Sequence, residues 1–255
     1  MLSTRHLFNC TIICCVLVYG VFLFANPVNP TPLVETEIGS ISMDPASIKV
    51  FRDSISANIY VKYKEPSSGE ATDSFWEATF TVPKRVLHCN KVVNWDSRRQ
   101  YFGKAHDLSG YHYVEPASPL DRIMQALIAE CQSRGRSVST EPFPFYKRGF
   151  QFLRHTDNVM SFFDPASVNL SDGLLEFTIL DFHYLSDLYN IHSVTVDTSH
   201  HQRRISPGKR HDGTGKIIGN VDGSEWTGYV PQSDFGKEVD IILEHYHSQY
   251  NQPAK

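Results

Sequence analysis

The sequence predicts an α+β protein: tandem small antiparallel β-sheets, each with a C-terminal helix packed on one face. Three observations predict this fold. Several segments alternate apolar and polar residues and are rich in β-branched and aromatic side chains, which indicates strands. Two later segments have the apolar spacing of an amphipathic helix. Short landmarks also occur twice in the same order, which indicates a duplicated unit.

Length and composition agree with this architecture. The chain has 255 residues, of which 41% are hydrophobic and 12% aromatic, so it is able to form packed cores. Its formal net charge of -4 lacks the basic excess expected of a nucleic-acid-binding chain, so we expect no nucleic-acid partner.

The first 25 residues have the layout of an export signal. Arg5 and His6 precede an apolar stretch at residues 7–25, which ends in a small residue. The stretch is also about as long as a membrane span, so a cleaved signal peptide and an uncleaved anchor both stay open. Lipidation at Cys14 or Cys15 is disfavoured, because bulky isoleucines precede them. In each case the rest of the chain is exported, to the periplasm or the cell surface.

Residues 26–40 contain three prolines and are expected to form an extended leader. Beyond the export segment only Cys89 and Cys131 remain. In an exported chain such a pair predicts one disulfide, and two unrelated buried thiols are the alternative.

Residues 41–132 are predicted to form the first unit. Strands are expected at 55–63, 75–82, 85–89 and 91–95. Ser118 followed by Pro119 indicates the start of a helix. The helix would face the sheet through an apolar stripe, which places Cys131 opposite the strand carrying Cys89. The stripe is Leu120, Ile123, Met124, Leu127, Ile128 and Cys131.

Residues 161–249 are predicted to form a second unit, after a connector at 133–160 and before a tail at 250–255. Strands are expected at 173–185, 190–197 and 225–230, and Ser233 is expected to open a helix. The stripe of that helix is Phe235, Val239, Ile242, Leu243 and Tyr246. The connector is expected to pack through Phe143, Phe145 and Phe150.

Four landmarks support the duplication. Their order is the same in both halves, with loop insertions between them. Residues 44–48 match 164–168, residues 87–89 match 191–193, residues 98–107 match 203–212, and residues 113–118 match 229–233. On this alignment Ser193 and Tyr246 take the places of Cys89 and Cys131, so the second copy lacks both cysteines.

The repeated segments RRQYFGKAHD and RRISPGKRHD are the best candidate site. Clustered arginine and lysine residues suit a sulfated glycan, a phosphate or an acidic protein surface. A solvated hairpin without a ligand is the alternative. The candidate residues are Arg98, Arg99, Lys104, Arg203, Arg204, Lys209 and Arg210.

Other chemistry finds less support. The chain has 12 histidines but no recognised ligand spacing, so we expect no metal. It has no nucleophile elbow, P-loop or dinucleotide-binding fingerprint, so we expect neither a cofactor nor enzymatic activity.

The order of a D-P-x-S-[IV] segment, a cysteine ending a strand, a P-x-S turn and a helix ending in cysteine resembles the bacterial surface-adhesin protein E family. Residues 41–132 carry the full set, and residues 162–249 match more loosely. The resemblance implies an exported or lipid-anchored domain whose C-terminal helix is tied to its sheet by a disulfide. It also implies binding to extracellular-matrix and serum proteins.

The sequence therefore predicts an exported cell-envelope binding protein, adhesin-like, that engages a protein or an anionic glycan such as a sulfated one. Residues 7–25 would add a membrane contact if uncleaved. The alternative is a periplasmic structural or assembly module that binds another envelope protein, and a hydrolase of an envelope polymer is the third reading.

Overall fold

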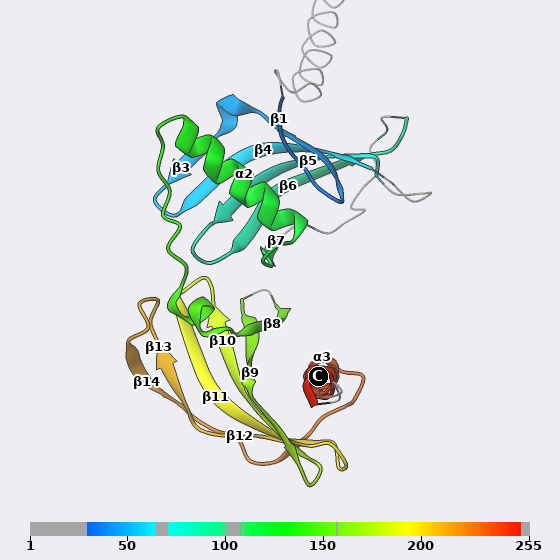
Figure 1. The fold of residues 1–255 in the computed structure, drawn as a ribbon, viewed down its shortest axis with the longest axis vertical. Coiled ribbons are helices and arrows are strands. Elements are labelled where there is room, and N and C mark those ends of the chain that lie inside the picture. The colour runs from blue at the N-terminus through cyan, green and yellow to red at the C-terminus, as the bar shows by residue number, and fades with distance from the viewer. Residues whose placement is uncertain are drawn as a thin grey trace, which may run out of the picture.

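The computed structural model describes residues 30–64, 71–98, 100, 108, 110–156 and 158–250. The predicted export segment and residues 251–255 lie outside the described residues. Within the described ranges no helix combines the length and apolar character needed to span a bilayer. Two mostly antiparallel sheets and two α-helices, one of them C-terminal, make up the fold (Figure 1).

The N-terminal unit, residues 31–133, contains a seven-stranded sheet, called sheet A. Its order is β1-β2-β4-β5-β6-β7, with β3 paired to β4. The strands are β1 (Thr31–Glu35), β2 (Gly39–Met43), β3 (Lys49–Phe51), β4 (Ser54–Tyr63), β5 (Asp73–Thr81), β6 (Val86–Trp95) and β7 (Gly110–Tyr113). The extended leader predicted at 26–40 is wrong from residue 31 onward, because Leu33 and Val34 pack against the core and β1 pairs with β2.

Helix α2 (Pro119–Ser133) lies across sheet A, as Figure 1 shows. Ser118 caps it by accepting a hydrogen bond of 3.2 Å from the Asp121 amide, as its sequence predicts. All buried positions of the predicted stripe join the core of sheet A, and they are Ile123, Met124, Leu127, Ile128 and Cys131. A short 3-10 helix, η1 (Pro45–Ser47), links β2 and β3.

The C-terminal unit, residues 151–250, contains an eight-stranded sheet, called sheet B, with the order β14-β13-β11-β10-β9-β8. The elements are β8 (Gln151–His155), β9 (Met160–Ser171), β10 (Leu174–His183), β11 (Leu188–Asp197), β12 (Gln202–Ile205), β13 (Gly208–His211), β14 (Ile217–Val221), β15 (Thr227–Gly228) and helix α3 (Asp234–Tyr250). The connector predicted at 133–160 is shorter, because β8 pairs with β9.

Sheet B has a hydrophobic core on each face. On one face, strands β9 to β11 pack against Val239 and Ile242 of α3. On the other face, a 3-10 helix of the connector, η2 (Pro144–Arg148), buries Phe145. Phe143 and Phe150 pack there too, as predicted.

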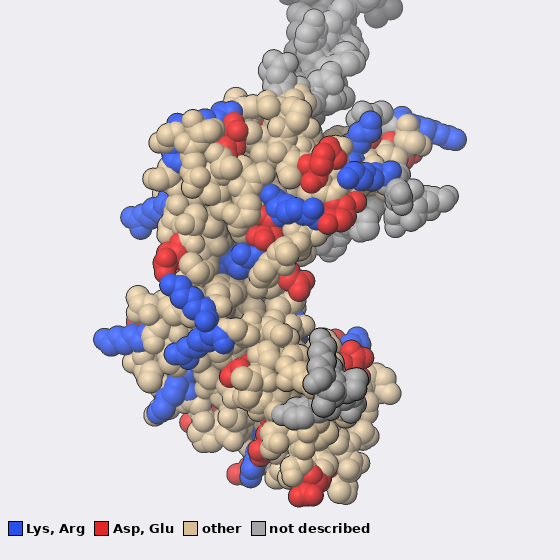
Figure 2. Space-filling view, viewed as in Figure 1, with Lys and Arg blue, Asp and Glu red and all other residues tan. Residues whose placement is uncertain are grey.

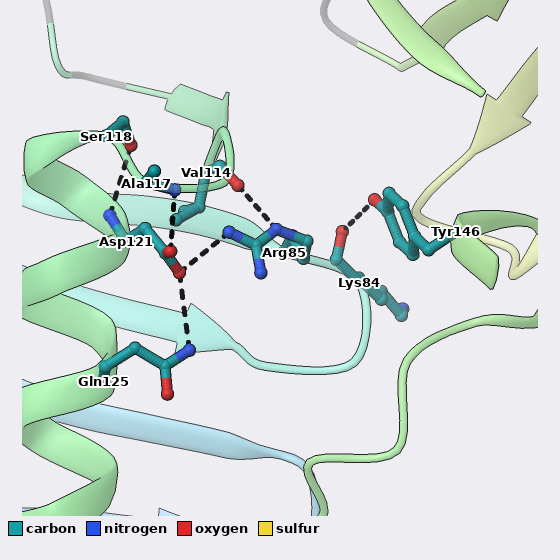
Figure 3. A network of polar contacts seen from close by, with 8 residues as sticks. All are labelled: Lys84, Arg85, Val114, Ala117, Ser118, Asp121, Gln125 and Tyr146. Atoms are coloured by element: carbon teal, nitrogen blue, oxygen red, sulfur yellow. Dashed lines mark hydrogen bonds and ion pairs between the residues drawn. The ribbon is translucent and has the colours of Figure 1, made fainter. Parts of the chain in front are cut away.

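The second of these cores also joins the two units. Val86, Tyr111 and Tyr113 of sheet A belong to it. The ring of Tyr113 stacks on Phe152 at 4.5 Å. The Tyr146 hydroxyl of η2 donates to the Lys84 carbonyl at 2.6 Å (Figure 3). We call this set of contacts the joint.

The DPAS segments make the same hydrogen bonds in both units, as η1 in the N-terminal unit and within β9 in the C-terminal unit. In the N-terminal unit Ala46 N–H donates to the Asp44 carboxylate at 2.9 Å, and Asn58 N–H donates to Ser47 Oγ at 2.8 Å. The same bonds recur 120 residues later. They run from Ala166 N–H to Asp164 at 3.0 Å and from Thr178 N–H to Ser167 Oγ at 2.8 Å.

The strand registers correct two of the four landmarks. Thr81 pairs with Val86 across β5 and β6, and Asp197 pairs with Gln202 across β11 and β12. Strand β6 therefore corresponds to β12 followed by β13, so residues 87–89 match 203–205 instead of 191–193. Segment 98–107 follows β6, whereas segment 203–212 forms β12 and β13. The identical residues of the two segments therefore lie in elements that are not equivalent. The counterpart of Cys89 is Ile205 and not Ser193.

Backbone geometry supports this corrected alignment. Arg85 and His201 both adopt the left-handed conformation, with φ of 53° and 51°. The carbonyl of each accepts from the residue that follows the last strand before its helix, from Val114 N–H at 2.7 Å and from Tyr229 N–H at 2.8 Å. Ser233 caps α3 by accepting from Gly236 N–H at 3.2 Å, as Ser118 caps α2.

Candidate functional site

The predicted cations of the N-terminal unit are only partly placed. Arg99 and Lys104 lie outside the described residues. Arg98 is exposed in the turn after β6, where its backbone N–H donates to the Asp96 carboxylate at 2.8 Å.

The four predicted cations of the C-terminal unit lie on β12 and β13 but do not form one patch. Successive strand residues face opposite sides of a sheet. The Arg203 guanidinium lies on the helix side, 4.2 Å from the ring centre of Phe235. The Arg204 guanidinium lies on the other side, 5.3 Å from the ring centre of Trp226.

The same division holds on β13. Arg210 is opposite Asn190 on the helix side and donates to its Oδ1 at 3.1 Å. Lys209 is opposite Ile191, which belongs to the joint core, and donates to Asn220 Oδ1 at 2.8 Å. Arg204 and Lys209 therefore share the face of sheet B that also carries η2.

Further cations surround Lys209 and Arg210. Figure 2 shows lysine and arginine side chains gathered over the region where the connector, β13 and β14 lie. The exposed cations of η2, β13 and the turn before β14 are Lys147, Arg148, Lys209, Arg210 and Lys216. Lys147 has an acidic partner, Glu141. Arg210 lies on the helix side, so we call Lys147, Arg148, Arg204, Lys209 and Lys216 the cationic surface.

A second polar feature lies between sheet B and α3, and the sequence did not predict it. Ser161 Oγ donates to Asp181 Oδ1 at 2.7 Å, and His192 Nε2 lies 3.7 Å from Asp181 Oδ2. Glu238 of α3 forms an ion pair with Arg154 of β8. Glu238 is 3% exposed, Ser161 1% and His192 9%. We call these five residues, with Arg203, the charged layer.

Burial governs the electrostatics of the charged layer. Desolvation raises the pKa of Glu238, and the Arg154 charge opposes that shift. Asp181 raises the pKa of Glu238 further, whereas Arg203 lowers it. Desolvation lowers the pKa of His192, against the charge of Asp181. The Nδ1 atom of His192 is buried without a hydrogen-bond partner.

The N-terminal unit has apolar side chains at every equivalent position. The strand registers and the two helix caps align Arg154, Ser161, Asp181, His192, Arg203 and Glu238 with Val34, Ile41, Val61, Trp76, Leu87 and Ile123, in that order. These six apolar residues belong to or pack against the core of sheet A. The charged layer is thus specific to the C-terminal unit, and no short motif could reveal it.

The charged layer lacks the side-chain arrangement of a nucleophilic hydrolase. Ser161 donates to a carboxylate and not to a histidine, which differs from the serine–histidine contact of a nucleophilic hydrolase. Among the described residues, no group of three or more His, Cys, Asp or Glu side chains is placed to hold a metal ion.

Cys89 and Cys131 are buried in the same core, on β6 and on α2, as the sequence predicts. They are free thiols in this structure, so the predicted disulfide is not formed in it. Burial raises the pKa of the Cys89 thiol to about 12 and also raises that of Cys131. Both therefore stay protonated and poorly reactive near neutral pH.

An open groove of about 450 Å³ lies where the two units and the connector meet. Asp53 and Pro83 of sheet A, Phe143 and Lys147 of the connector, and Gly213 after β13 contribute to its wall. Its mixed lining indicates no particular ligand.

Comparison of the chain with protein-family models, with curated proteins and with solved structures finds no match. Function is therefore inferred from the cationic surface and the charged layer.

Proposed function

We propose that the chain is an exported, adhesin-like binding protein of the cell envelope, formed by tandem duplication of one α+β unit. The C-terminal unit binds the ligand, which is an anionic glycan or an acidic protein surface. The cationic surface carries this proposal, because it gathers exposed lysine and arginine side chains on a chain of net charge -4.

The chemistry of these side chains fits such a ligand. A guanidinium binds a sulfate or carboxylate through two parallel hydrogen bonds. Arg204 is exposed beside Trp226, a residue that is 39% exposed and whose ring offers an apolar plane next to the charge. The ligand would contact both.

The export layout and the resemblance to the surface-adhesin protein E family support the location. That compartment also suits the disulfide that the sequence predicts between Cys89 and Cys131, although both are free thiols in this structure. Surface display and retention in the periplasm are distinguished by protease treatment of intact cells. Cleavage of the chain while a periplasmic control survives supports display, and survival of both supports retention.

The alternative, a periplasmic assembly module, is favoured by one observation. Strand β14 lies at the end of sheet B, and it exposes Ile217 (56%) and Ile218 (49%). An unpaired strand edge with apolar side chains is able to pair with a strand of another protein.

Heparin affinity tests the glycan-binding proposal. Arg204→Ala with Lys209→Ala should weaken binding about tenfold, equal to about 1.4 kcal/mol. Wild-type binding should fall steeply as salt rises, because the attraction is screened. Lys49→Ala with Lys62→Ala is the matched control, since it removes two exposed charges from sheet A. Equal losses in both variants, or no binding by the wild type, would reject the proposed site.

A further inference from the structure

We propose that the surface of sheet B beneath α3 is a concealed binding site for an anionic group. In this structure the Glu238 carboxylate of α3 occupies that site. The inference rests on the proposed function in one respect, the anionic class of the ligand. It adds a second site, which lies on the opposite face of sheet B from Arg204 and Lys209.

The contacts of Glu238 are those of a bound carboxylate. It enters from α3, is 3% exposed, and pairs with Arg154 of β8. Arg203 of β12 is a second cation whose charge acts on it. The His192 side chain is 8% exposed, and its Nδ1 has no hydrogen-bond partner. Asp181 also faces this space, where it accepts from Ser161 and approaches His192.

The fold itself does not require these charges. The N-terminal unit has the same strand pairing and the same helix cap, yet Ile123 takes the place of Glu238, and Val34 and Leu87 take those of Arg154 and Arg203. Replacing a well-packed apolar cluster by a buried ion pair is often neutral or destabilising. The charged layer therefore calls for a role other than stability.

The start of helix α3 lacks an attachment that the start of α2 has. Arg85 holds the start of α2 by donating to Asp121 and to the Val114 carbonyl, both at 2.8 Å (Figure 3). The equivalents of Arg85 and Asp121 are His201 and Gly236, which cannot form this bond. A Cβ at Gly236 would overlap the Pro231 carbonyl, so an aspartate does not fit there.

The other end of α2 is fastened as well. Arg134 donates to the Pro45 carbonyl at 3.0 Å, and Arg136 donates to the Ile48 carbonyl at 2.8 Å.

The ligand group is a sulfate or a carboxylate of an anionic glycan. It would pair with Arg154 and Arg203 in place of Glu238. The Glu238 carboxylate would then move away from sheet B together with α3. Arg203 and Arg204 are adjacent on β12 and face opposite sides of sheet B. A glycan bound at Arg204 would therefore lie one residue along the strand from the concealed site on the other face.

Hydrogen exchange of the full chain tests the displacement. A heparin oligosaccharide should speed exchange in residues 236–250 and leave residues 121–133 unchanged, so α2 serves as the internal control. An unsulfated polyuronate tests whether carboxylate alone suffices, and an effect of either glycan supports the site. No change with either, or a change only with a polyglutamate peptide, would overturn the proposed glycan ligand.

A charge-matched pair of variants tests the occupant. Glu238→Gln should raise heparin affinity about tenfold, and adding Arg154→Met should abolish the gain. Glu244→Gln removes the same charge from the exposed side of α3 and should have a much smaller effect. Equal gains in both would show a net-charge effect and reject the site. If Glu238→Gln fails to fold, the wild-type exchange experiment decides.

These outcomes separate the two proposals. Wild type that does not bind heparin, combined with binding by Glu238→Gln, rejects the cationic surface and keeps the concealed site. If wild-type binding depends on Arg204 and Lys209, and Glu238→Gln and Glu244→Gln do not differ, the cationic surface is supported and the concealed site is rejected.

Discussion

Ser47 and Ser167 show how much one side chain can organise in this fold. Each hydroxyl donates to a carbonyl in its own loop, at 2.6 Å and 2.7 Å, and accepts from a strand residue eleven positions later. The serine thereby connects the loop to the centre of the sheet. The recurrence of DPAS was visible in the sequence, but its structural reason was not.

The charged layer could not be predicted at the residue scale for a physical reason. Asp181 and His192 are ordinary polar residues in alternating strands, and Glu238 is an ordinary helix residue. Only the strand register and the helix cap bring them together. By contrast, Ser118 and Ser233 were predictable, because a cap is decided by its immediate neighbours.

His192 makes stability depend on pH. Burial lowers its pKa below the ordinary 6.5, so the unfolded chain binds the proton more readily. The free energy of unfolding should therefore fall as the pH drops below about 6.5. Glu238 acts in the opposite direction, because burial raises its pKa.

Denaturant unfolding of wild type and His192→Gln between about pH 7 and 5 isolates the histidine. The variant should lose less stability than the wild type over this range. Parallel pH profiles would contradict the assignment.

The cysteine pair gives a second prediction at this scale. In protein isolated from an oxidising compartment, Cys89 and Cys131 should resist alkylation under denaturing conditions until a reductant is added. Mass spectrometry counts the modified thiols. Full alkylation without reductant would show that both remain the free thiols seen in the structure.

At the scale of elements, α2 and α3 have the same start but different attachments. Both begin within one residue of the predicted serine cap. Strands β4, β5, β10 and β11 also follow the predicted alternation. Nine strands were missed, namely β1, β2, β3, β7, β8, β9, β12, β13 and β14. In β1 a proline hides the alternation, and in β12 and β13 consecutive charged residues do so. The strand expected at 225–230 is only Thr227–Gly228, which pairs at the edge of sheet B.

Gly236 provides the prediction for α3. Gly236→Ala should destabilise the C-terminal unit by about 2 kcal/mol or more, because the new methyl group overlaps the Pro231 carbonyl. Gly228→Ala is the control, since the nearest atom to its added Cβ lies at 3.9 Å. Thermal unfolding by circular dichroism measures both. Equal effects would mean that the backbone before α3 adjusts.

At the scale of the whole molecule, the joint combines the two units through aromatic rings. Tyr113 of sheet A meets Phe152 and Phe162 of sheet B, at 4.5 Å and 5.3 Å between ring centres. Lys84 adds a hydrogen bond of 2.9 Å to the Tyr184 carbonyl. The sequence indicated that the connector aromatics pack, but the contribution of β7 depends on the arrangement of both sheets.

Weakening the joint should uncouple the units. Tyr113→Ala with Tyr146→Ala should split one calorimetric unfolding transition into two, because the shared core is lost. Tyr60→Ala, which removes a ring packed on Phe75 within sheet A, should lower the stability without splitting the transition. Two transitions already present in the wild type would show that the units unfold independently.

The DPAS loop has a consequence for how such a chain can evolve. Because each DPAS segment is bonded to the neighbouring strand, β4 or β10, through its serine hydroxyl, pairing is preserved while the side chains beneath the helix change. Under the proposed duplication, the C-terminal unit could diversify while the N-terminal unit kept an apolar interior. The N-terminal unit is therefore an apolar reference for the C-terminal unit. Replacing its six apolar residues by the six residues of the charged layer should transfer the charged groups to the N-terminal unit.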